Sequence, residues 1–529
     1  MGVGPMTKGS PNWKLAPALQ AQTQGLIASG FNTMPYGQAL LLTFAWPPGV
    51  RGGAWFAALG TVVEVQDGVS GKDRNRSAAL AVTWTGLQRM GLDHRALASF
   101  SRPFREGMFQ EDRSRRLGDR TLGAWCDTVI PGGPFWSGNT PSDPADPPVV
   151  TKLTVHALLT LYTTDEADGA AWAAAVKAAL EPAGIRAVHE LELLLDINGA
   201  GTSSEHFGFA DGLSQPRPYG LAAPADERKM VLCDGIPAVR DPVQGVPLGE
   251  ILIGYLNGYS EPAPGPFVPK PVAAGGGPDP SDIARLPSHP LAEGCADLGL
   301  NGSYLVVREL KQDVAAFWTS LEANAQRLRN ADPGATHITA MWLAQRVIGR
   351  STDGDLLCPG GFLKPAADKL PDSDYVFHAR DPHGVGCPAG SHVRRANPRD
   401  ALAPLPTADS RAELLHAANN HRILRRGRKY GPKIADTGVD DGVDRGLLFM
   451  CLNTDIARQF EFVQQTWLLN TSFATLFGES DPLLGPPGPM TVRDSPLRRR
   501  VHVESYVRMA GGEYFFLPSI PALRYLSLL

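Results

Sequence analysis

The stretch His206-Phe207-Gly208-Phe209-Ala210-Asp211-Gly212-Leu213-Ser214-Gln215-Pro216 sets one carboxylate, that of Asp211, between glycines and aromatic side chains. It holds too much glycine for a regular strand, because glycine loses more conformational freedom on folding than any other residue. Asp211 has two interpretations. Its side chain can form an Asx turn with its own backbone, or it can be a carboxylate held against an apolar pocket for proton transfer.

A second stretch, from Phe377 to Asp400, contains Gly386-Cys-Pro-Ala-Gly-Ser-His392-Val-Arg-Arg-Ala-Asn-Pro-Arg-Asp400. It places His392 between a Gly-Ser turn and a basic run. A lone histidine is more often a hydrogen-bonded structural residue than a ligand. A zinc site is an alternative, since four potential ligands lie within fifteen residues: His378, His383, Cys387 and His392. Their spacing fits none of the common structural zinc patterns. Axial ligation of a haem iron is the other functional interpretation.

A third stretch, His421-Arg-Ile-Leu-Arg425-Arg426-Gly427-Arg-Lys-Tyr430-Gly431, is strongly basic. One interpretation is a solvated or phosphate-facing loop. The other is a single guanidinium directed into a pocket where negative charge develops during a reaction.

Around these stretches the hydrophobic pattern predicts two halves that both mix strands and helices. In the first half we expect strands over 38–45, 77–84, 153–162 and 185–196, and a helix over 165–180 that Pro182 ends. In the second half we expect strands over 303–310 and 446–452 and a helix over 312–326. A further helix is predicted from an apolar face formed by Ile456, Phe460, Val463 and Trp467.

Between the halves, residues 262–280 hold seven prolines and four glycines among nineteen residues. No regular element tolerates that composition, so the segment is predicted to be a linker. No direct sequence repeat relates the two halves.

Composition excludes several classes of function. The 529 residues carry 50 Lys and Arg against 54 Asp and Glu, a net charge of −4. This near-balance argues against a nucleic-acid binder that depends on phosphate contacts. No apolar run approaches the ~18 residues of a membrane span, and no signal peptide is visible at the N-terminus. Six scattered cysteines without a CxxC pair indicate reduced thiols. We therefore expect a cytoplasmic protein that binds neither nucleic acid nor membrane.

Together the three stretches resemble the dye-decolourising peroxidase family, of the long bacterial type. The resemblance is carried by Gly208-x-x-Asp211-Gly212 with its Ser-Gln-Pro continuation, by the segment from Cys387 to Arg399, and by Arg425-Arg426-Gly427 followed by the apolar run 446–451. It implies an α+β fold of two ferredoxin-like halves with antiparallel sheets and a haem b in the second half. The expected division is an N-terminal extension (1–35), a first half with the GxxDG motif (36–222), a Pro/Gly-rich connection (223–300) and a haem-binding half (301–529).

The resemblance also implies roles for single residues. His392 matches the axial iron ligand, Asp211 and Arg425 match the distal acid–base and charge-stabilising pair, and Leu447 and Phe449 match apolar residues lining the distal cavity. The implied enzyme reduces hydrogen peroxide and oxidises dyes, phenols or other bulky organic reductants. An aspartate, with an ordinary pKa near 3.9, stays a base in acid where a histidine, near 6.5, would not. The sequence leaves open the physiological reductant, manganese oxidation and the oligomeric state.

Two further expectations concern residues around the haem. An axial histidine usually needs a carboxylate on its other nitrogen, and Asp455 and Asp481 are the candidates. Asp455 has the simpler interpretation of a negative charge at a helix N-terminus. Because bulky dyes would not reach an enclosed haem, Tyr430 or Trp467 is predicted to relay electrons. We expect Tyr430 to be exposed in a Gly-flanked loop, whereas Trp467 can equally be a core residue.

Two other functions compete with the peroxidase. One is a haem-binding, iron-handling protein whose peroxidase activity is incidental, although such a carrier has no need of Asp211 and Arg425. The other is a non-haem metal hydrolase built on the His/Cys cluster, which a haem absorption band would exclude.

Overall fold

The computed structural model describes residues 15, 17–47, 49–69, 75–138, 151–197, 203–219, 230–231, 237–238, 243–263, 265–270, 279–363, 373–403 and 407–529. The predicted extension and the predicted linker lie partly outside these residues. Among the described residues, no helix combines the length and the apolarity that crossing a membrane requires.

One eleven-stranded sheet organises the molecule. Its strands are β1 (Tyr36–Phe44), β2 (Arg76–Val82), β5 (Trp136–Ser137), β6 (Leu153–Thr154), β7 (Ala157–Thr163), β8 (Ile185–Leu194), β17 (Ser303–Gln312), β20 (Leu424–Arg425), β21 (Arg428–Tyr430), β22 (Gly446–Asn453) and β25 (Val507–Leu517). The strands predicted from the sequence all fall within this sheet. Only the third one is divided, into β6 and β7.

The strand order confirms two ferredoxin-like halves. In the first half the order is β8-β1-β7-β2, and in the second it is β25-β17-β22-β21. Numbered along the chain, both orders read 4-1-3-2, and the pairs within each half are antiparallel. β21 also pairs with β8 and β2 with β25, so the two four-stranded sheets close on one another.

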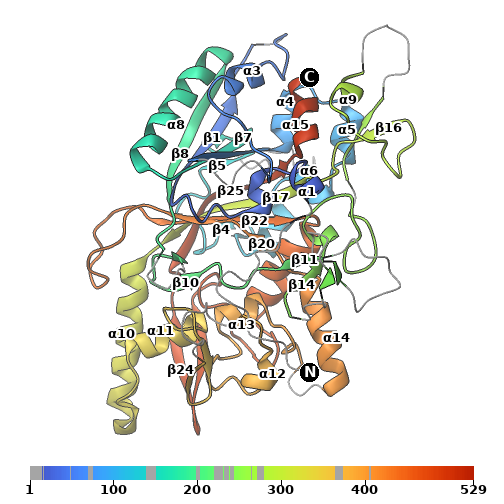
Figure 1. Ribbon diagram of the computed structural model, residues 1–529. Coiled ribbons are helices and arrows are strands. Elements are labelled where there is room, and N and C mark those ends of the chain that lie inside the picture. Colours follow the sequence, from blue (N-terminus) through green and yellow to red (C-terminus); the bar gives the residue numbers. More distant parts are fainter. Residues whose placement is uncertain are drawn as a thin grey trace.

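Helices cover the outer faces of both halves (Figure 1). α8 lies over the first half at the top of the view, and α10, α11 and α13 lie over the second half at the bottom. The helices are α1 (Pro17–Gln20), α2 (Gly25–Ala28), α3 (Trp55–Gly60), α4 (Trp84–Arg89), α5 (His94–Ser99), α6 (Arg102–Glu106), α7 (Glu111–Arg116), α8 (Glu166–Leu180), α9 (Pro280–Ile283), α10 (Val314–Ala331), α11 (Ala340–Ile348), α12 (Phe377–Arg380), α13 (His392–Ala396), α14 (Ala408–Asn419) and α15 (Ile520–Ser527).

Local sequence explains where the long helices begin and end. The Asp165 side chain accepts a hydrogen bond from the backbone N–H of Asp168 at the start of α8, and Asp313 caps α10 in the same way. α8 ends before Pro182, as expected, and Pro182 lies in a following 3₁₀ turn. The helix predicted around Ile456 is instead two π-helical segments, Ala457–Glu461 and Val463–Leu468. The apolar face predicted for it is buried throughout.

Seven small two-stranded sheets decorate this frame: β3 (Arg120–Thr121) with β4 (Ala124–Trp125), β9 (Ser203–Ser204) with β10 (Ala210–Asp211), β11 (Arg217–Tyr219) with β14 (Gly245–Pro247), β12 (Met230–Val231) with β13 (Pro237–Ala238), β15 (Phe267–Pro269) with β16 (Cys295–Asp297), β18 (Leu356–Cys358) with β19 (Gly361–Leu363), and β23 (Gly488–Asp494) with β24 (Leu497–Val503). β15 lies inside the predicted linker. The prediction that no regular element forms there is therefore wrong, because β16 supplies its hydrogen-bonding partner.

Alternate residues of the main strands fill two different cores. One face of each four-stranded sheet packs against the other half. The side chains between the two halves form one buried cluster, which includes Leu41, Leu158, Val307 and Met450. The opposite faces pack beneath the helices. This burial on both faces explains why the strand sequences are continuous apolar runs and do not alternate with polar residues.

Candidate functional site

Asp211 and Arg425 form an ion pair at the site predicted from the sequence. Asp211 lies in β10, and its Oδ1 accepts a hydrogen bond from the Arg425 guanidinium at 3.1 Å. The same oxygen accepts the backbone N–H of Gly212 at 2.6 Å. The Asx-turn interpretation of Asp211 is therefore confirmed, and the same carboxylate faces a cation, whereas proton transfer by Asp211 stays a prediction. The turn needs glycine because Gly212 has a φ of +76°.

The expectation that this stretch holds too much glycine for a strand is wrong at one point. Ala210 and Asp211 pair with Ser204 and Ser203 in a short antiparallel ladder. Ala210 also donates its N–H to the carbonyl of Thr352, at 2.9 Å. These backbone bonds help to fix the position from which Asp211 projects.

Gln215 holds the backbone of Arg425 in place. The Gln215 side chain accepts the Arg425 N–H at 3.0 Å and donates to the Arg425 carbonyl at 3.2 Å. The neighbouring Arg426 has a different task, because its guanidinium donates to the carbonyls of Leu26 and Ile27, each at 2.8 Å. Burial lowers the pKa of Arg426 to about 10. Of the two arginines, only Arg425 reaches Asp211.

Leu447 and Phe449 share a sheet face with Arg425. Arg425 in β20 lies opposite Cys451 in β22, and alternate residues of a strand point to the same side. Leu447 and Phe449 are half-buried, whereas Leu448 and Met450 point the other way into the core between the halves. The distal pair therefore has apolar neighbours on the helix-covered side of the second half.

His392 is the first residue of α13, and its imidazole is tied to Asp481. Nδ1 of His392 lies 3.0 Å from Oδ2 of Asp481, a carboxylate that also accepts the N–H groups of Leu483 and Leu484. Burial lowers the pKa of His392, but the charge and hydrogen bond of Asp481 outweigh it, so that pKa is raised. Burial likewise raises the pKa of Asp481, yet His392 brings it below its ordinary value. The charges of Arg425 and Asp211 also act on the pKa of His392, where Arg425 lowers it and Asp211 raises it.

Arg395 joins the His392 helix to the segment that carries Asp481. Its buried guanidinium donates to the carbonyls of Trp467, Leu468, Asn470 and Glu479. These four hydrogen bonds, together with the His392–Asp481 contact, tie α13 to the segment 467–481.

The free atoms of this region fit a bound haem. Among the described residues, no hydrogen-bond partner is found for Nε2 of His392, and 26% of that side chain remains exposed. With Nδ1 bound to a carboxylate, Nε2 is the nitrogen available to a metal. Within the described part of the chain, both polar atoms of the buried Asn397 amide also lack a partner. Burial without a partner is costly for an amide.

The zinc alternative does not fit the geometry. Among the described residues, no three His, Cys, Asp or Glu side chains converge as a metal site would require. Nε2 of His378 bonds the carbonyl of Ala403, and Sγ of Cys387 contacts Oγ of Ser391 at 3.1 Å. The cluster His378, His383, Cys387 and His392 is therefore close in sequence only.

The predicted exposure of Tyr430 is wrong. Tyr430 is the last residue of β21, where it is buried in the core between the two sheets with only 3% of its surface exposed. Pairing of β21 with both β8 and β22 draws it inward. Trp467 is also buried and packs edge-to-face against His421 and Phe462, which agrees with its core interpretation. Electron relay through either residue stays a prediction.

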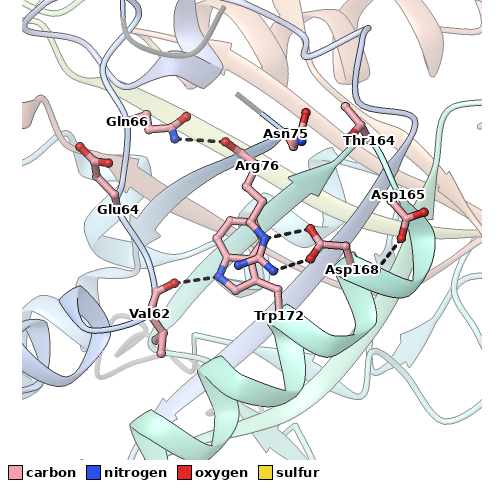
Figure 2. A pocket seen from close by; sticks show the side chains of 9 residues that line it. All are labelled: Val62, Glu64, Gln66, Asn75, Arg76, Thr164, Asp165, Asp168 and Trp172. Atoms are coloured by element: carbon pink, nitrogen blue, oxygen red, sulfur yellow. Dashed lines mark hydrogen bonds and ion pairs between the residues drawn. The ribbon is translucent and has the colours of Figure 1, made fainter. Parts of the chain in front are cut away.

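A cavity of about 600 Å³ lies elsewhere, beside α8 (Figure 2). Several of its polar groups are bonded to one another: Nε of Arg76 donates to Asp168 at 2.8 Å, and Nε1 of Trp172 donates to the carbonyl of Val62. None of the sequence-predicted site residues lines it. The candidate functional site therefore remains the one predicted from the sequence, His392 with the Asp211–Arg425 pair.

The sequence analysis did not predict the roles of two residues in this site, Glu205 and Gln215, and did not decide the role of a third, Asp481. Glu205 precedes the Asp211 stretch and bonds the loop of that stretch. Gln215 was visible as part of the Ser-Gln-Pro continuation, although its role was not. Asp481 was one of two candidates, and no local signal could choose it because it lies 89 residues from His392.

Comparisons with known proteins agree with this geometry. The chain is 30% identical over 369 residues to the multifunctional dye peroxidase of Amycolatopsis sp., a match covering 65% of this chain and 66% of that protein. It is 27% identical over 347 residues to a dye-decolorizing peroxidase of Mycetinis scorodonius, covering 60% and 56%. The matches thus span slightly less than two thirds of these relatives' own length.

The fold as a whole has solved counterparts. A DyP-type peroxidase of Anabaena sp. superposes with a TM-score of 0.67 at 21% identity, covering 99% of this chain and all of that one. At this identity the likeness shows the fold alone. No protein-family model matches the sequence.

Proposed function

Because the chain belongs to the dye-decolorizing peroxidase family, we propose that it is a haem-dependent peroxidase. It reduces hydrogen peroxide and oxidises dyes, phenols or other bulky organic reductants. The observation that carries this proposal is the Asp211–Arg425 ion pair, which lies within electrostatic reach of an imidazole that has one nitrogen free.

Haem b is the proposed cofactor, held in the second half. His392 would ligate its iron through Nε2, while Asp481 accepts a hydrogen bond from Nδ1–H and so fixes the tautomer. Leu447 and Phe449 would contact it from the apolar sheet face, and Arg425 from the same side. When bound, the haem supplies the iron at which peroxide reacts and the oxidising power that organic donors then consume.

Asp211 handles the proton of the reaction. As a carboxylate it accepts a proton from one peroxide oxygen and returns it to the other, which leaves as water. Its ion pair with Arg425 orients the carboxylate, and both contacts fall on Oδ1, so that among the described residues Oδ2 is left for this transfer. The charge of Arg425 stabilises the negative charge that builds up on the departing oxygen.

The variant Asp211→Asn tests this role, because it keeps the shape of the side chain and removes the base. We expect an unchanged haem content and a peroxide step slowed by about 10²–10⁴-fold, the usual contribution of general acid–base catalysis. Stopped-flow mixing with hydrogen peroxide measures the rate. A haem-handling protein with incidental activity is the alternative function, and a wild-type rate in this variant would favour it.

A further inference from the structure

Glu205 lies directly before the Asp211 stretch, and the loop folds around its carboxylate. Oε2 accepts the N–H of Phe207 at 2.7 Å and Oε1 accepts that of Phe209 at 2.9 Å. The amide of Gln312, the last residue of β17, donates to Oε2 at 2.7 Å. Glu205 also exchanges backbone bonds with Phe209 and Gly208. One side chain thus accepts two backbone N–H groups of the loop and connects the loop to the central sheet through Gln312.

Aromatic side chains of the same loop also pack against α10. Phe207 stacks on Phe317 with ring centroids 4.3 Å apart, and Phe209 lies parallel to Trp318 at 6.4 Å. Both phenylalanines are almost completely buried. Because their backbone N–H groups are the donors to Glu205, packing and hydrogen bonding fix the same two residues. Asp211 follows only two residues later.

Glu205 and Asp211 also face one small cavity. It has a volume of about 20 Å³ and is lined by Glu205, Asp211 and Leu447, with the Asp196–Lys429 ion pair (3.0 Å) at its wall. This volume holds a single water. Burial raises the pKa of Glu205 to about 7, and the negative charge of Asp211 adds to the rise, so the two carboxyl groups interact.

We propose that Glu205 is a positioning residue for Asp211, because it fixes the loop that carries the distal carboxylate and contacts the same water-sized cavity. The inference rests on the proposed peroxidase function. Glu205 does not take the peroxide proton itself. Its effect on the rate passes entirely through the position of Asp211, and this dependence separates it from an independent catalytic group.

A double-mutant cycle on the haem-loaded full chain tests the inference. The variants are Glu205→Gln, Asp211→Asn and their combination, and the reading is the stopped-flow rate with hydrogen peroxide. We expect Glu205→Gln to slow the step roughly 10- to 100-fold, as a small displacement of a catalytic group does. The combined variant should be no slower than Asp211→Asn alone, because the two residues act as one unit.

A readout other than activity accompanies the cycle. Hydrogen exchange of the backbone amides over 205–211 should quicken in Glu205→Gln, since an amide group in place of the carboxylate turns a donor toward a backbone N–H. The matched control is Glu513→Gln, which alters another carboxylate that accepts backbone N–H donors, those of Met108, Gly138 and Tyr514. The control should leave the peroxide step unchanged.

Gln312→Met gives a milder variant if Glu205→Gln folds poorly, because it removes only the side-chain donor. It should slow the step less, again without further effect when Asp211 is already Asn. A wild-type rate in Glu205→Gln, or equal slowing on both backgrounds, would overturn the inference alone. A wild-type rate in Asp211→Asn would overturn the proposed function, and the inference with it.

Discussion

The carboxylate of Asp481 lies 3.0 Å from Nδ1 of His392, on a segment 89 residues further along the chain. Two backbone N–H groups, of Leu483 and Leu484, hold that carboxylate in place. A histidine whose Nδ1 proton is shared with a carboxylate is a more basic ligand through Nε2. The pair therefore links the fold of residues 481–484 to the electronic properties of a bound haem iron.

Replacing Asp481 by Asn should raise the reduction potential of the haem iron, because the imidazole then donates less electron density. A spectroelectrochemical titration of the haem-loaded protein measures the potential. The control is Asp455→Asn, since Asp455 caps the backbone N–H of Arg458 and should affect only stability, by about 0.3–1 kcal/mol. If Asp455→Asn shifted the potential more than Asp481→Asn does, Asp481 would not be the partner of His392.

Arg425→Leu and Arg426→Leu should affect different properties although the residues are adjacent: the first the reaction rate, the second the stability. Arg425→Leu removes the guanidinium on Asp211 and should slow the peroxide step by about 10²–10³-fold. Arg426→Leu leaves the carbonyls of Leu26 and Ile27 without their donor. It should lower the free energy of unfolding by about 1–3 kcal/mol and change the rate little. Stopped-flow rates and denaturant unfolding of both variants test this prediction. If Arg426→Leu slowed the peroxide step more than Arg425→Leu, the two roles would be exchanged.

His206 should make the protein less stable in acid. Burial lowers its pKa to about 4, while the Nε2–H donates to the carbonyl of Tyr430 at 2.8 Å. The unfolded chain takes up a proton near pH 6.5 and the folded one does not. The stabilisation is therefore complete above pH 6.5 and is lost as the pH falls toward 4, by up to about 3 kcal/mol.

His206→Gln keeps a donor for Tyr430 and removes the titration, so its unfolding free energy should fall less between pH 6.5 and 4.5. Urea unfolding at both pH values measures this slope. His94→Gln, at a side chain that is 88% exposed, serves as the control. Equal slopes in the wild type and in His206→Gln would show that His206 does not titrate in this range.

Much of the frame was predictable because its signals are local. Continuous apolar runs indicated the long strands, and Pro182 indicated the end of α8. The 4-1-3-2 order of each half, and the closure of one half on the other, depend on pairing between strands such as β21 and β8. Such partners are far apart in the sequence and leave no local pattern.

The candidate site, too, was only partly predictable from the sequence. The three stretches that contain Asp211, His392 and Arg425 were singled out by their unusual composition, and the family resemblance then chose these residues within them. The buried position of Tyr430 was not predictable, since the flanking glycines suggested a loop and only the sheet partners of β21 make it a strand. β15 was missed for a similar reason, because a distant strand overrides the proline-rich composition.

Axial ligation by His392 is the central claim, and one measurement tests it most directly. The visible absorption spectrum is recorded for the purified wild type and for His392→Ala, before and after one equivalent of hydrogen peroxide. The wild type should show a haem absorption band that changes on addition of peroxide. His392→Ala should lose most of the haem and the response. A full haem complement with a wild-type response in His392→Ala would contradict the account.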